Sequence, residues 1–78
     1  MTTKLAIINV MGSIIEKCVS KKGTPISGSK IAALIVGYQT LKLLCKTLGE
    51  DYIDVEENIT SSYLMATYVL KEEGIDIY

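Results

Sequence analysis

The stretch from Lys21 to Leu48 reads KKGTPISGSKIAALIVGYQTLKLLCKTL, and the rest of the chain is arranged around it. It opens with a loop that contains the only proline of the chain and continues into the longest apolar helical pattern. Apolar side chains recur there at intervals of three and four residues, at Ile31, Leu34, Tyr38, Leu41, Cys45 and Leu48. This spacing predicts a helix that ends at Leu48, because Gly49 follows it. Three capping residues, Thr24, Ser27 and Ser29, leave the start of that helix open.

The residues on either side of this stretch predict two further helices. The first covers residues 3–22, because Pro25 excludes its continuation and Gly23 suits its C-terminal cap. Residues 50–54 form an acidic connection, and Asp54-Val55-Glu56-Glu57 has the form of a capping box that opens a third helix, which Gly74 closes. We therefore expect an all-α fold with a single helical domain, residues 1–78, in which a helical hairpin is joined by a third helix.

The length of the chain and the width of its apolar faces predict self-association. A chain of 78 residues buries only about 60% of its unfolded surface. Helix 3–22 is apolar over most of its circumference, and the turn Ile31–Val36 is apolar on every side. Three helices cannot hide all of this surface from one another. We expect an oligomeric helical bundle, a dimer or larger, that associates through the first two helices, with Ile35 and two of Ile7, Val10 and Ile14 in the interface.

The residue types that are absent exclude most catalytic and metal-binding chemistry. The chain contains no histidine, so Ser-His and Cys-His nucleophiles are excluded and a zinc site is not expected. Cys18 and Cys45 lie inside apolar helical patterns, which predicts that both are buried and reduced. The acidic run from Glu50 to Glu57 lacks the spacing of a calcium loop. We expect a protein that is not an enzyme and that holds no cofactor and no metal.

Charge is distributed unevenly and indicates where partners could bind. Residues 1–30 carry five lysines and one glutamate, a charge of +4, whereas residues 31–78 carry three lysines and eight acidic residues, a charge of -5. The chain has no arginine, which argues against nucleic acid as a partner. Its charge-free runs, 5–15, 31–41 and 58–70, are shorter than the roughly 18 residues that a membrane span needs. We expect a cytoplasmic protein with no membrane partner.

The loop from Lys21 to Lys30 is the candidate binding site. A helix N-terminus offers free N–H groups and positive potential, glycines admit an anion, and lysines and hydroxyls add donors. The candidate residues are Lys21, Lys22, Thr24, Ser27, Gly28, Ser29 and Lys30. The glycines Gly23 and Gly28 have the spacing of a Walker A pair, but Ser29 stands where that motif requires lysine, so we exclude an NTPase. The alternative is an ordinary turn with caps and solubilising lysines.

A helix-turn-helix interpretation of the second helix is weaker than one continuous helix. Ala33 and Gly37 have the spacing of that motif, but the segment after Gly37 has no Arg or Asn to contact bases. A continuous helix with Gly37 at a close helix contact is the favoured interpretation.

Two function classes remain. The first is a non-enzymatic binding protein that sequesters or senses a phosphate-containing, nucleotide-like small molecule through the Lys21–Lys30 loop. The alternative is a protein–protein interaction module, an inhibitor or adaptor such as phages encode, that presents helical surfaces including an acidic third helix.

Overall fold

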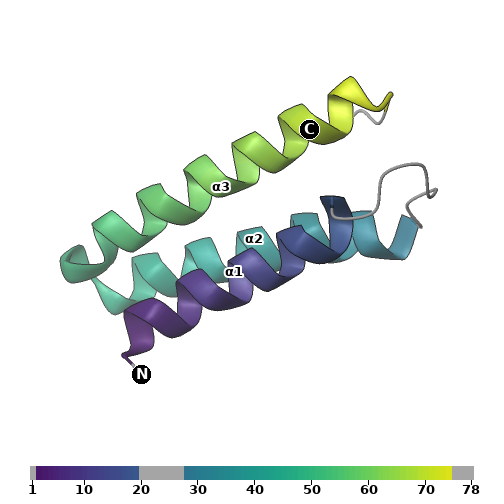
Figure 1. The fold of residues 1–78 in the computed structure, drawn as a ribbon. Coiled ribbons are helices and arrows are strands. Elements are labelled where there is room, and N and C mark those ends of the chain that lie inside the picture. Colours follow the sequence, from purple (N-terminus) through teal and green to yellow (C-terminus); the bar gives the residue numbers. More distant parts are fainter. Residues whose placement is uncertain (1, 20–27, 75–78) are drawn as a thin grey trace.

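The computed structural model describes residues 2–19 and 28–74, and it consists of three long helices. Helix α1 spans Thr3–Val19, α2 spans Gly28–Leu48 and α3 spans Ile53–Glu72, with a short 3-10 helix, η1, at Glu50–Tyr52. Helices α1 and α2 run antiparallel as a hairpin, and α3 returns alongside them in the direction of α1 (Figure 1). These described segments contain no strand, so the all-α three-helix fold is confirmed.

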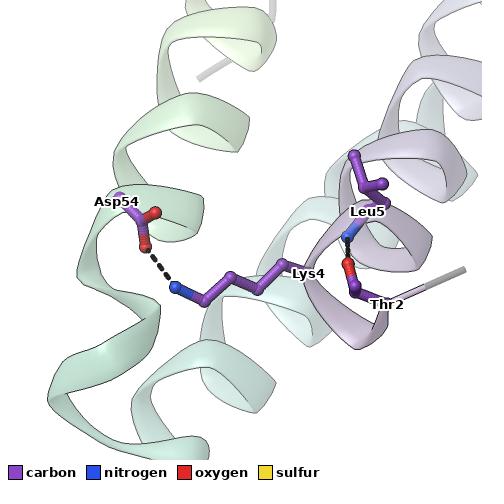
Figure 2. A network of polar contacts seen from close by, with 4 residues as sticks. All are labelled: Thr2, Lys4, Leu5 and Asp54. Atoms are coloured by element: carbon purple, nitrogen blue, oxygen red, sulfur yellow. Dashed lines mark hydrogen bonds and ion pairs between the residues drawn. The ribbon is translucent and has the colours of Figure 1, made fainter.

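Helix α1 begins where its sequence predicts. The Thr2 Oγ1 atom accepts a hydrogen bond from the Leu5 N–H at 3.1 Å, which caps the first turn (Figure 2). The described part of the helix ends at Val19, and the predicted continuation to Lys22 lies outside the described residues. Its inward face is apolar: Ile7, Met11 and Cys18 are buried, while Ile14 and Ile15 are half-buried.

Helix α2 is one continuous helix, as favoured over the helix-turn-helix interpretation. Leu34 and Cys45 are its buried residues. At Gly37 the backbone comes so close to α1 that an added Cβ would lie 2.7 Å from Ile14 Cδ1. The helix ends at Leu48, and Gly49 follows with a φ of 102°, a conformation that L side chains rarely adopt.

The start of α3 differs from the prediction. We expected residues 50–54 to be a connection and Asp54 to cap the helix. Instead η1 leads directly into α3, so the helix begins at Ile53 and Tyr52 occupies the cap position without a side-chain hydrogen bond. The Tyr52 N–H donates to the Gly49 carbonyl at 3.1 Å, so the chain is already coiled before it reaches Asp54. The prediction that Asp54 opens α3 as part of a capping box was therefore wrong. The Asp54 carboxylate is 3.4 Å from Lys4 Nζ on α1 (Figure 2).

The end of α3 follows the sequence. Gly74 has a φ of 89°, and its N–H donates to the Lys71 carbonyl, which closes the last turn.

The core lies between the three helices and is small. Its buried members are Ile7, Met11, Cys18, Leu34, Cys45, Val55, Ile59 and Leu70. Tyr38 of α2 and Tyr63 of α3 stack beside them with ring centroids 4.1 Å apart, and the hydroxyls of Tyr38 and Thr60 share a hydrogen bond of 2.9 Å. Among the described residues nine apolar side chains are buried and eleven large ones are exposed. The single chain therefore leaves much of its apolar surface in water.

The structure narrows the predicted oligomer interface to Ile35, Val10 and Ile14. Ile7 is only 4% exposed because it fills the core of the protomer, so it is not available to a second copy. Val10 is exposed, and Ile14 and Ile35 are half-buried. The self-association itself stays a prediction.

Candidate functional site

The structure describes three of the seven predicted site residues. Gly28, Ser29 and Lys30 form the first turn of α2, and all three are exposed. The other four, Lys21, Lys22, Thr24 and Ser27, lie outside the described residues. The first turn of α2 contains no acidic residue, so nothing in that turn offsets the positive end of the helix dipole.

A cavity opens between α1 and α2 directly beside this turn. It encloses about 150 Å³ and is lined by Ile14, Lys17, Cys18, Lys30 and Ala33. The antiparallel hairpin brings the C-terminal half of α1 next to the start of α2, so each helix contributes one lysine. The sequence analysis missed Lys17 because its position relative to Lys30 depends on the register of the hairpin. The close contact between Ile14 and Gly37 fixes that register.

Cys18 closes the inner side of the cavity. Its Sγ donates a hydrogen bond to the Lys30 carbonyl at 3.3 Å, which joins the two helices at this level. Burial raises the pKa of the Cys18 thiol, and the nearby Lys30 charge only partly opposes that rise. Cys18 is therefore neutral at pH 7 and acts as a small apolar wall with a weak donor. Both Cys18 and Cys45 are buried and free of disulfides, as predicted.

The lining combines positive charge with an apolar floor. Lys17 and Lys30 supply two ammonium groups, Ile14 and Ala33 supply apolar surface, and no carboxylate belongs to the lining. Ammonium groups next to low-dielectric surface attract an anion more strongly than they do in open water. A small anionic group with an apolar neighbour matches this chemistry.

A second cavity has the opposite electrostatic character. It encloses about 250 Å³ at the corner of α2, η1 and α3, lined by Cys45, Lys46, Gly49, Glu50, Ile53 and Glu56. Burial, followed by the charges of Glu56 and Asp54, raises the pKa of the Cys45 thiol. The carboxylates repel anions here, so this corner is no candidate for the predicted ligand.

Metal ligands do not gather in the described part of the chain. Within residues 2–19 and 28–74, no three side chains of the types His, Cys, Asp and Glu come close enough to hold a metal ion. By length and composition alone, α2 could cross a membrane; a mostly buried core helix of a soluble protein passes the same test, whereas only 11% of the apolar stretch of α2 is buried.

The outer face of α3 carries an apolar patch. Leu64, Met65 and Tyr68 are all exposed, and their spacing places them together in the C-terminal half of the helix. Glu57 and Glu72, one turn or more away on either side, are exposed too. This combination is typical of a surface that contacts a basic, amphipathic partner.

Comparison with protein-family models, with curated proteins and with solved structures found no match to this chain.

Proposed function

We propose that the protein is a non-enzymatic binding protein for a phosphate-bearing small molecule, which docks at the cavity between α1 and α2. The observation that supports this proposal is the pairing of Lys17 and Lys30 in one lining that contains no carboxylate. The phosphate would lie between the two ammonium groups, and an apolar part of the ligand, such as a base or sugar face, would contact Ile14 and Ala33. The lysines of the preceding loop, Lys21 and Lys22, add to the same positive region of the sequence.

The expected affinity follows from the number of charged contacts. Hydrogen bonds to charged groups contribute roughly 1.5–3 kcal/mol each, so two of them correspond to dissociation constants of about millimolar or tighter. Because these contacts are electrostatic and solvent-accessible, binding should weaken as the salt concentration rises from about 0.01 M to 0.15 M.

Isothermal titration calorimetry with inorganic phosphate and a panel of mononucleotides and cyclic nucleotides tests the proposal. We expect at least one compound to bind the wild type and to lose tenfold or more in affinity in the double variant Lys17→Ala, Lys30→Ala. The matched control is Lys42→Ala, Lys46→Ala, which also removes two positive charges. Both of these lysines are on α2, and neither lines the cavity between α1 and α2. A second variant, Lys22→Ala with Lys30→Ala, measures the contribution of the loop. Equal losses in the cavity pair and the control pair would show that only net charge matters.

The exposed patch of α3 favours a second candidate function, a protein–protein interaction module. The observation that favours this function is the group of exposed apolar residues Leu64, Met65 and Tyr68 beside exposed carboxylates. Fluorescence anisotropy with a basic amphipathic helical peptide tests it. We expect binding that is lost on Glu56→Lys, Glu57→Lys and retained on Lys22→Glu, Lys30→Glu, whereas the anion-binding function predicts the reverse sensitivity for nucleotide binding.

A further inference from the structure

The outward face of α2 carries a continuous stripe of uncharged residues. Its members follow one another at intervals of four and three residues, and all are exposed: Ser29, Ala33, Val36, Thr40, Leu43 and Thr47. Val36 is 58% exposed and Leu43 is 66% exposed. The three lysines of α2, at positions 30, 42 and 46, all fall outside the stripe. The outward face of a surface helix normally carries charged and polar residues, whereas this one has no charge and exposes Val36 and Leu43.

The spacing of the stripe identifies the kind of contact. Alternating intervals of three and four residues form the seam along which two helices pack side by side. Small residues alternate with the large ones, since Ala33 precedes Val36 and Thr40 lies between Val36 and Leu43, and they allow a second helix to approach closely. The stripe therefore fits a helix laid along α2.

We propose that this helix is the α2 of a second copy, packed antiparallel about a two-fold axis near Thr40. A two-fold interface uses the same patch twice, and in this arrangement Val36 of each copy packs against Leu43 of the other. The dimer covers apolar surface that the small core of one protomer leaves in water.

The charge distribution decides the orientation. The end of the molecule at η1 and the start of α3 holds Glu50, Asp51, Asp54, Glu56 and Glu57, with Lys4 and Lys46 as its lysines. The other end of the molecule, where α1 and α3 end and α2 begins, holds Lys17, Lys30 and Lys71 together with Glu16, Glu72 and Glu73, so its described charges sum to zero. A parallel pair would bring two acidic ends within a Debye length, about 8 Å at physiological salt. An antiparallel pair separates them by about 30 Å, the length of a 20-residue helix, and sets each acidic end beside the near-neutral end of the other copy, which avoids the repulsion.

Two further observations separate this occupant from a lipid bilayer. The longest charge-free run of α2 is residues 31–41, about half of the roughly 20 residues that span a membrane. The Lys42 ammonium lies 5.8 Å from the centroid of the Tyr38 ring on the side of α2 that faces α3, so it is held within the bundle.

A single helix seam is smaller than a standard interface, which takes about 800 Å² from each partner out of the 5350 Å² that one protomer exposes. Interfaces below the standard size are typical of weak association, so we expect a dissociation constant of roughly micromolar order or weaker.

Analytical ultracentrifugation between micromolar and millimolar concentration tests the dimer. We expect the wild-type mass to rise from 8.5 kDa toward twice that value, while Val36→Lys, Leu43→Lys stays at 8.5 kDa. The control Leu64→Lys, Tyr68→Lys makes the same change on the exposed face of α3 and should dimerise like the wild type. Far-UV circular dichroism of each variant checks that it is folded. A wild type that stays monomeric throughout, or a control that loses the dimer instead, would overturn the proposal.

Disulfide pairing tests the orientation. In an equimolar mixture of Val36→Cys and Leu43→Cys proteins, the antiparallel arrangement predicts mainly mixed disulfides, and preferential homodisulfides contradict it. A third experiment, co-sedimentation with phosphatidylglycerol-containing vesicles, tests whether the stripe binds lipid instead. The proposal would be overturned if the wild type is monomeric in solution and binds vesicles, and if Val36→Lys, Leu43→Lys abolishes that binding. Lipid would then be the occupant of the stripe. Ala33 belongs both to the stripe and to the lining of the anion cavity, but the variants change only Val36 and Leu43, which do not line it, so the dimer and the proposed function can be tested separately.

Discussion

Gly37 shows how a single missing side chain sets the distance between two helices. Glycine in a helix interior costs about 1 kcal/mol relative to alanine, so its presence in α2 needs a compensating contact. That contact is Ile14 of α1, whose terminal methyl occupies the space that a Cβ at position 37 would need. Gly12 of α1 is a useful comparison, because an added Cβ there would meet nothing within 4 Å.

We predict that the effect of Gly37→Ala depends on Ile14. In the wild type the gain in helix propensity is offset by displacement of the Ile14 methyl, so the free energy of unfolding should change little. In an Ile14→Val background, which lacks that methyl, the same substitution should stabilise by about 1 kcal/mol. Gly12→Ala should stabilise by a similar amount in both backgrounds. Urea denaturation of the wild type, Gly37→Ala, Ile14→Val and the double variant gives the coupling energy between positions 14 and 37. A value near zero would show that the two residues do not compete for space.

The two buried thiols predict a dependence of stability on pH. Burial raises the pKa of Cys18 and of Cys45 above the ordinary value of a cysteine. Above about pH 8.5 the thiols ionise in the unfolded chain while the folded chain keeps its protons. The unfolded state then binds fewer protons, so the free energy of unfolding must fall as the pH rises. The loss is at most about 1.4 kcal/mol per thiol and pH unit.

Denaturation at pH 7.0 and pH 9.5 measures this fall. The Cys18→Ala, Cys45→Ala protein is less stable at both values because it lacks two core side chains, but it should lose less between them than the wild type does. Thiol labelling should be slow in the folded protein and fast in denaturant. A wild type and a double variant with equal pH slopes would show that the thiols are not responsible.

At the scale of the element, Thr2 and Asp54 have different roles at the starts of their helices. Thr2 accepts the Leu5 N–H and satisfies a donor of the first turn of α1. Asp54 lies inside the first turn of α3, where it interacts with Lys4 across the gap between two helices. The side chains of Lys4 and Asp54 are 42% and 70% exposed, so their ion pair is screened by water.

We predict that Thr2→Ala costs about 1 kcal/mol of stability, the usual cost of a lost cap. Asp54→Asn should cost less than that, since it removes only an exposed ion pair and a favourable dipole contact. Raising the salt concentration should reduce the effect of Asp54→Asn and leave that of Thr2→Ala unchanged. Thermal denaturation of both variants at low and high salt makes the comparison, and a salt-independent loss at Asp54 would restore a capping role.

At the scale of the whole molecule, the core is small and the exposed apolar surface is large. Eleven large apolar side chains are exposed in the described part of the chain, and they lie mainly on the outward faces of α2 and α3. A protomer with so small a core is marginally stable, and assembly is one of the few ways to reinforce it.

The proposed dimer therefore makes the melting temperature depend on protein concentration. Because association stabilises only the folded state, the midpoint should rise between about 5 µM and 500 µM in the wild type. It should be constant in Val36→Lys, Leu43→Lys. Differential scanning calorimetry at the two concentrations gives the shift, and a midpoint that is independent of concentration in the wild type would contradict a reversible dimer in this range.

The sequence alone determined the helical class, the ends of the second and third helices at Gly49 and Gly74, and the burial of both cysteines. These features depend on residues within a turn or two of one another, so local patterns suffice. The tertiary structure decided which side chains meet. It placed Ile7 in the core, started α3 at Ile53 and brought Lys17 beside Lys30. Those outcomes depend on the register of one helix against another, which is set by packing between residues distant in sequence, such as Ile14 against Gly37.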